Sequence, residues 1–421
     1  MTERGSAELS KARKKADYLV RRAEGALLSG AVLGAEGSHL LPAEALAKAE
    51  KLAAEMPGLE ARLSLLKDAA GGSLRRSEYI ERYGCAGVRR FAIEGGARIY
   101  LLPVETFPRH MNNVYLIMDP GRSTLFDVGS GFDSSRRDLA LGFAVVRDIY
   151  QEDAHFETVS EAVISHAHID HFGGVGDLRA SSKAILSIHE LDYRVIACFE
   201  ERVVIALKDI EVFLCRAGVP PEERERLLAL YLSSRDSFKS VQVDRSLRDG
   251  DRVGGGAHGH RVIHTPGHCP GQICLSAGGV LLTSDHVLSR ITPHQFPQAI
   301  TPYVGLENYF HSLAKVRDME GVRLALGGHE DPIPDLPRRV DEILAFHRGR
   351  LDAVKALCAE PTTVAEVARA LFGAQEGYGV ILAIEEAGAH VEYLHERGQL
   401  RIANVGEIAV TRDPVFRYQN R

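Results

Sequence analysis

Six consecutive residues beginning at His166 read His-Ala-His-Ile-Asp-His, which places three imidazoles and one carboxylate in one short segment. Zinc accepts both kinds of ligand, and iron and manganese accept them less selectively. In an extended segment His166 and His168 face the same side, while Asp170 and His171 follow and can face a second ion. The apolar residues 162–165 read as the end of a buried strand, and two glycines follow the run. The spacing therefore predicts a metal site at a strand end, rather than a surface cluster of histidines.

Three more potential ligands occur downstream, each where a predicted strand gives way to a loop. They are His268 after the strand 261–265, Asp285 after the strand 280–284, and His329 after the strand 323–326. Because strand ends converge on one edge of a sheet, these side chains are expected to meet on a rigid scaffold.

The pattern His166-x-His168-x-Asp170-His171, followed by the three downstream residues, resembles the metal-binding signature of the metallo-β-lactamase superfamily of hydrolases. The resemblance covers roughly residues 96–335. It implies an α+β fold, a four-layer αββα sandwich with two divalent ions at one edge. Zinc is the expected metal, with iron or manganese as alternatives. The implied ligands are His166, His168 and His268 for the first ion, Asp170, His171 and His329 for the second, and Asp285 bridging both.

Four further residues receive expected roles. By the resemblance, Asp127 orients a ligand histidine rather than binding metal itself. His264 and His286 are expected to support the site from behind its ligands, and His294, on a loop marked by proline, is a candidate substrate contact. Ser284 departs from the resemblance, because glycine usually precedes the bridging acid; a small residue remains, so little effect is expected.

Composition indicates an ordinary soluble protein of 421 residues with a formal net charge of −6. That charge does not attract nucleic acid or an anionic membrane, and no apolar run is long enough to span a bilayer. The start of the chain lacks the apolar core of a signal peptide, so a cytoplasmic location is expected. The six cysteines are scattered without a C-x-x-C pair, which predicts reduced thiols. Cys269 follows His268 directly and is expected to be a neighbour of the site.

The chain divides by pattern into three parts. They are a helical N-terminal extension (1–95), a metallo-β-lactamase domain (96–336) with a helical insertion at about 190–238, and a winged-helix-like C-terminal domain (337–421). For the last part we predict helices over 338–357, 363–372 and 385–397, followed by a hairpin of residues 400–402 and 407–410.

A metallo-β-lactamase domain with such a tail resembles the β-lactamase-like protein 2 subgroup, whose members include thioester hydrolases and endoribonucleases. The predicted third helix of the tail carries four glutamates against one arginine, a poor fit to a phosphate groove. The tail is therefore expected to serve in packing or in forming a homodimer, and nucleic acid is not expected as a partner.

Two ions about 3.5–4 Å apart can activate water and polarise an electrophile together. Asp170 is the expected catalytic acid–base, orienting the nucleophile and passing its proton to the leaving group. The leading hypothesis is a hydrolase of a small carbonyl ester, either an acyl thioester or a lactone. The alternative is a metal-dependent phosphodiesterase or endoribonuclease. A binding module without activity is disfavoured because all seven ligand positions are filled.

Overall fold

The computed structural model describes residues 87–421 except for 149, 233–237 and 256–258. The predicted helical extension (1–95) lies outside these residues up to residue 86, and its described part, 87–95, contains a short strand rather than a helix. The described chain forms two compact units. The first contains residues 87–163, 169–185 and 253–260, and the second contains residues 164–168, 186–252 and 261–421, less the gaps. The predicted division into three domains stays a prediction.

The first unit is built on an antiparallel run of strands. Its strands are β1 (Arg89–Ala92), β2 (Arg98–Phe107), β3 (His110–Asp119), β4 (Arg122–Phe126) and β5 (Glu161–Ile164), in that order across the sheet. Only β4 and β5 run parallel. The helices are α5 (Asp133–Asp148), η1 (Phe156–Thr158), α6 (Ile169–Phe172) and α7 (Val175–Ser181). Helix α5 packs on β2 because Gly142 lets the helix approach Leu102 closely. The strand end expected at residues 162–165 is confirmed by β5, which ends at Ile164.

The second unit contains a sheet ordered β9 (His260–His264), β10 (Ile273–Ala277), β11 (Val280–Ser284) and β12 (Leu324–Gly327). Strands β9 to β11 are antiparallel, and β12 runs parallel to β11. All of β11 is buried, as its apolar sequence predicts. The second unit also contains the parallel strands β6 (Ile185–His189) and β7 (Arg245–Leu247). The short strand β8 (Arg252–Val253) includes the last residue of one segment of the second unit and the first residue of a segment of the first.

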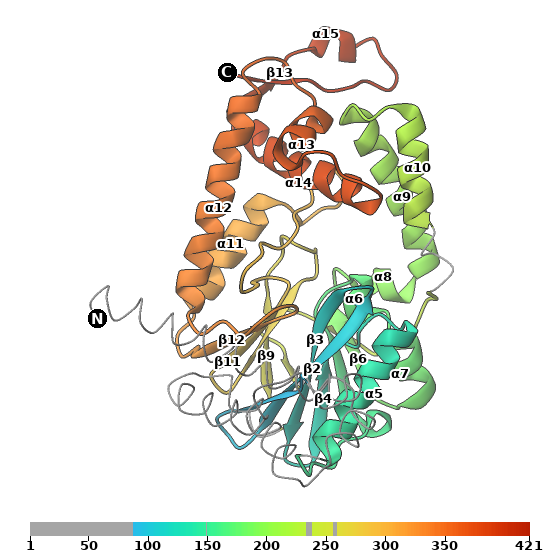
Figure 1. The fold of residues 1–421 in the computed structure, drawn as a ribbon, viewed down its shortest axis with the longest axis vertical. Coiled ribbons are helices and arrows are strands. Elements are labelled where there is room, and N and C mark those ends of the chain that lie inside the picture. Colours follow the sequence, from blue (N-terminus) through green and yellow to red (C-terminus); the bar gives the residue numbers. More distant parts are fainter. Residues whose placement is uncertain (1–86, 149, 233–237, 256–258) are drawn as a thin grey trace, which may run out of the picture. The chain divides into compact units, whose positions relative to one another are not determined.

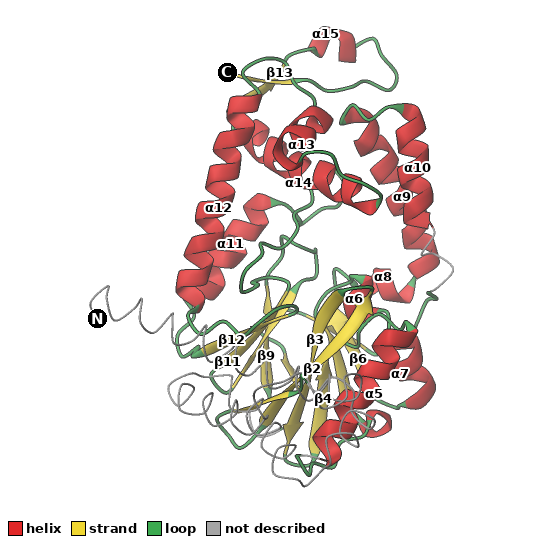
Figure 2. Ribbon diagram, viewed as in Figure 1, coloured by secondary structure: helices red, strands yellow, loops and turns green. Residues whose placement is uncertain are grey.

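Helices make up much of the second unit and gather beyond the ends of β9, β11 and β12 (Figure 2). They are α8 (Tyr193–Ala197), α9 (Phe199–Arg216), α10 (Pro221–Leu232), α11 (Leu306–Arg317), α12 (Leu336–Leu357), α13 (Val364–Phe372), α14 (Tyr378–Glu396) and α15 (Val405–Ile408). Helices α8–α10 lie within residues 190–238, where a helical insertion was expected. Within the described residues, no helix combines the length and the apolar content that crossing a membrane requires.

Helix α14 is the central element of this helical region (Figure 1). It contacts α10, α11, α12 and α13. Gly388 of α14 lies so close to Phe213 of α9 that a Cβ there would be 2.7 Å from the ring. The helix begins at Tyr378, seven residues before the predicted start at 385, because the apolar residues 378–384 pack into the core through Ile381 and Ile384. Residues 337–421 therefore share a core with the insertion.

The C-terminal region agrees with the predicted helices 338–357 and 363–372, and the second of these helices begins with a capping box of Thr363 and Glu366. The second strand predicted at 407–410 is wrong. Residues Val405–Ile408 form α15, and β13 (Leu400–Ile402) pairs instead with β14 (Tyr418–Asn420). The Asn404 side chain donates to the Val415 carbonyl at 2.8 Å and accepts from the Arg417 amide at 3.0 Å, which closes the intervening chain into a loop.

A pair of stacked histidines joins α12 to α14. His390 Nδ1 donates to the Glu386 carbonyl at 2.7 Å, so its Nε2 accepts from His347 Nδ1 at 3.1 Å. Burial lowers the pKa of His347 to about 3 and also lowers that of His390. Both rings are therefore neutral at pH 7.

We expect this pair to make the fold sensitive to acid. The folded pKa of His347 lies below the unfolded value of about 6.5, so the unfolded chain takes up the proton first and stability falls as pH drops through this window. At pH 5 the loss from His347 is on the order of 2 kcal/mol. His347→Gln keeps a donor for His390 but cannot titrate. Urea unfolding of the metal-free chain at pH 7 and pH 5 should show a smaller pH-dependent loss in the variant. Equal losses in both proteins would contradict the expectation.

Candidate metal centre

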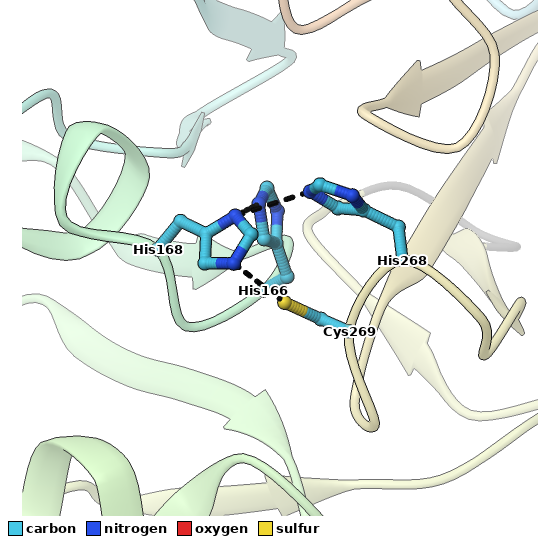
Figure 3. A group of neighbouring side chains, drawn as sticks. All are labelled: His166, His168, His268 and Cys269. Carbon is cyan, nitrogen blue, oxygen red and sulfur yellow. Dashed lines mark hydrogen bonds between the residues drawn. The ribbon is translucent and has the colours of Figure 1, made fainter. Parts of the chain in front are cut away.

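The second unit brings together three histidines from two loops. His166 and His168 follow β5, and His268 follows β9. His166 Nε2 lies 3.0 Å from His168 Nδ1, and His268 Nε2 lies 3.1 Å from the same atom. Figure 3 shows the three rings turned toward one another, with Cys269 at the opposite edge of His168. Three nitrogens thus converge on one point, as the sequence spacing predicts for one end of the site.

The outer nitrogen of His268 shows which nitrogen can bind a cation. His268 Nδ1 lies 2.7 Å from the carbonyl oxygen of His294. A carbonyl can only accept, so Nδ1 carries the proton and the neutral ring presents a lone pair from Nε2 toward His168. This lone pair faces His168 Nδ1 at 3.1 Å, where it can accept a hydrogen bond or bind a cation.

The outer nitrogen of His166 is held by a chain of two hydroxyls. Ser165 Oγ lies 2.9 Å from His166 Nδ1, and Ser284 Oγ donates to Ser165 Oγ at 2.7 Å. Ser284 has a positive φ of 45°, a left-handed conformation in which glycine is free of strain. This explains why glycine suits the position, and it shows that serine adds a specific hydrogen bond there, which was not expected from the sequence.

Cys269 completes the set of outer partners. Its Sγ lies 3.2 Å from His168 Nε2, the nitrogen that points away from His166 and His268. The thiol is buried. Cys269 therefore borders the site, as expected, and its position fixes the ring of His168 so that Nδ1 faces inward.

Asp285, at the end of β11, lies between two candidate ligands. Its Oδ2 is 3.2 Å from His329 Nε2 and 3.7 Å from His268 Nε2, and all three side chains are buried. Three imidazoles whose nitrogens face inward and a neighbouring carboxylate form a donor set that fits zinc, and also iron or manganese. The fit rests on this chemistry and on the engaged outer nitrogens.

Asp170 and His171 belong to the first unit, where they lie in α6. His171 Nδ1 is 2.8 Å from Asp127 Oδ2, and both side chains are buried. Asp127, at the end of β4, has a positive φ of 67°. The carboxylate thus holds one nitrogen of His171 and turns Nε2 outward, the geometry that the expected orienting role requires.

Two neighbours of Asp170 were missed from the sequence. Asn112 Nδ2 donates to Asp170 Oδ2 at 3.0 Å and lies 3.2 Å from His171 Nε2. His110 Nε2 lies 3.2 Å from the same carboxylate oxygen, and its side chain is 49% exposed. Both residues are on β3, which carries no motif, so their position near the hairpin end of the strand is the signal that could have found them.

Asp192 is another residue that the sequence did not reveal. Its carboxylate, 1% exposed, accepts from the Ala167 amide at 3.0 Å and from the Gly271 amide at 2.9 Å. Burial raises its pKa to about 6, although the two hydrogen bonds act in the opposite direction. The amides belong to the loops that carry His166 and His268, so one side chain ties both loops together.

The three remaining predicted residues are all partly or fully buried in the second unit. His264 stacks on His189 at 3.9 Å between ring centroids, and its Nε2 lies 2.8 Å from the Pro270 carbonyl. His286 is fully buried against Tyr309, and burial lowers its pKa to about 3. Burial would lower the pKa of His294, but hydrogen bonds with two glutamates outweigh it and raise the value to about 9. Their expected roles stay predictions.

A model of the metallo-β-lactamase superfamily matches residues 108–329, which include every candidate ligand. The acyl-coenzyme A thioesterase MBLAC2 from Bos taurus is 26% identical over 221 residues, covering 52% of this chain and 72% of its own. The human MBLAC2 is likewise 26% identical over 222 residues, with the same coverage.

Two solved structures share the fold. A metallo-β-lactamase family protein from Thermus thermophilus is 29% identical with a TM-score of 0.60, covering 77% of this chain and 98% of its own. A β-lactamase domain protein from Burkholderia ambifaria is 24% identical with a TM-score of 0.62, covering 79% of this chain and 94% of its own. The expected α+β fold of the superfamily is thereby confirmed.

The hydroxyl chain behind His166 can be tested with two variants of Ser284. Ser284→Ala and Ser284→Gly both remove the hydroxyl, so each should weaken zinc binding about 10-fold, as loss of an outer partner typically does. Only the glycine relieves the left-handed backbone, and it should be more stable than alanine by about 1 kcal/mol in metal-free protein. Competition with a chromophoric chelator measures the affinity. Unchanged affinity in both variants would remove the hydroxyl from the site's support.

Proposed function

Since the chain belongs to the metallo-β-lactamase superfamily and is a hydrolase of that fold, we propose that it is a metal-dependent hydrolase of a small acyl thioester or lactone. The observation that carries the metal dependence is the convergence of His166, His168 and His268 with every outer nitrogen engaged. The choice of a carbonyl substrate draws on the similarity to MBLAC2, a thioesterase by name.

We propose two divalent ions, zinc first, on the ligand set that the motif implies. Such ions supply a nucleophile from water at neutral pH and polarise the substrate carbonyl. The chain's own residues hold the geometry. Asp285 lies between His268 and His329, where a carboxylate can serve two ions, and Asp127 fixes the ring of His171.

Asp170 is proposed as the acid–base. Its Oδ2 receives a hydrogen bond from Asn112 and lies beside His110, so the carboxylate is fixed in orientation before substrate arrives. A carboxylate held in this way can orient the attacking water and carry its proton to the departing thiol or alcohol. No serine or cysteine nucleophile is required by this scheme.

The phosphodiesterase or endoribonuclease alternative rests on the same metal chemistry. It is disfavoured by the net charge of −6, which does not attract a polyanion. Homodimer formation and a separate role for the C-terminal region stay predictions of the sequence.

Metal content provides the first test. We expect two ions per chain after growth with zinc or iron, and Asp285→Ala should lose most of them because it removes the shared carboxylate. Asp318→Asn, an exposed aspartate at the end of α11, is the matched control and should keep wild-type metal content. Metal analysis that finds one ion or none in the wild type would refute the dinuclear proposal.

A substrate panel provides the second test. Acyl-coenzyme A thioesters and lactones should be hydrolysed in a chelator-sensitive way, with little cleavage of single-stranded RNA. Asp170→Asn should lower kcat about 10²–10⁴-fold, as loss of an acid–base typically does, while the chain still folds. Efficient RNA cleavage with intact thioesters and lactones would reverse the ranking of the two functions, and an unimpaired Asp170→Asn enzyme would remove Asp170 from the mechanism.

A further inference from the structure

The orientation of His268 depends on the backbone of a loop that has no ligand of its own. The proton on His268 Nδ1 is donated to the His294 carbonyl at 2.7 Å. If this carbonyl moved, the ring could rotate about its side-chain bonds and its Nε2 would leave the point where the three histidines converge. What holds residue 294 in place therefore also holds His268.

The side chain of His294 is held between two carboxylates of α14. Its Nε2 lies 3.3 Å from Glu385 Oε2, and its Nδ1 lies 3.3 Å from Glu386 Oε2. Glu386 Oε2 also accepts from the Gln295 amide at 2.7 Å. The two glutamates are only 2% and 5% exposed. The ring of His294, whose side chain is 21% exposed, contacts two adjacent side chains of α14, which diverge by about 100° around the helix.

The same helix holds the loop at a second point. Glu392, about two turns after Glu385, accepts from the amides of Gln298 and Ala299 at 2.6 and 2.9 Å. Glu386 is in turn paired with Arg350 of α12. Burying a carboxylate costs free energy unless the carboxylate is paired. Here the paired groups include backbone amides of the loop that carries His294. From the sequence these glutamates were interpreted as surface charges. In the structure they accept hydrogen bonds from the loop that contains His294.

Glu386 also lies in a group with His347 and His390 that has the composition of a metal site. Their contacts favour a different explanation. His390 Nε2 already accepts from His347, and the Arg350 guanidinium is bound to Glu386 Oε1. A second cation on that oxygen would meet an arginine. The group is better explained as a fixed support behind Glu386.

We propose that Glu385 and Glu386 of α14 are positioning residues for the metal ligand His268, acting through His294. The C-terminal helix is then a structural part of the metal site rather than an appended module. The inference rests on the proposed metal role of His268, and it is independent of the substrate.

The test compares Glu385→Gln with Glu396→Gln, an exposed glutamate on the same helix, in the full-length chain. Glutamine keeps the shape of Glu385 but removes its charge, which should weaken the hold on His294. We expect zinc affinity, measured by competition with a chromophoric chelator, to fall about 10-fold or more in Glu385→Gln. The absorption spectrum of the cobalt(II)-loaded protein should change, because the angle of one imidazole changes. Glu396→Gln should match the wild type in both.

Unfolding of the metal-free proteins separates positioning from folding. Glu385→Gln should keep a wild-type thermal midpoint without metal while its zinc affinity falls. Wild-type zinc affinity and cobalt spectrum in Glu385→Gln would overturn the proposal while leaving the proposed function standing. An affinity loss matched by an equal loss of metal-free stability would also overturn it. A wild-type chain that binds no zinc or cobalt would refute both proposals.

Discussion

An imidazole has two nitrogens, and only one can face a given ion, so a histidine site depends on what engages the other nitrogen. In this protein each of the three converging histidines has such a partner: a serine hydroxyl for His166, a cysteine thiol for His168 and a backbone carbonyl for His268. The partner at His268 is the most restrictive, because a carbonyl accepts and never donates. The inward lone pair follows from that one hydrogen bond.

These partners reach the site from elements that are distant in sequence. Ser165 is supported by Ser284 at the end of β11, 119 positions later, and His294 is supported by α14, 91 positions beyond it. The hydrogen bonds to the outer nitrogens thus connect the end of β11 and helix α14 to the same group of candidate ligands. The shared core of α9–α14 gives the helix a fixed position from which to do so.

The sequence predicted that His166, His168 and His268 lie close together, because candidate ligands follow short apolar strands, a pattern that is local and periodic. Residues 162–165 and 280–284 indicate strand ends, and His166 and Asp285 follow directly. Asp192 and Asn112 carry no such pattern, since their partners lie 25 to 79 residues away and include backbone amides, which nearly every residue has. From the sequence, Glu385 and Glu386 were interpreted as solvent-exposed charges. Their burial depends on how α14 packs against the rest of the second unit, which the local sequence does not reveal. The strand expected at 407–410 failed for the same reason: a strand needs a partner, and β13 found its partner in β14.

Asp192 bears on how the site moves as well as on how it is built. One carboxylate accepts from Ala167 and Gly271, so neither loop can swing away without stranding a charged or polar group in the interior. The two loops are consequently bound into a single cooperative unit. A metal bound at the three histidines, as proposed above, would therefore be expected to exchange more slowly while Asp192 holds both loops than after this carboxylate is removed.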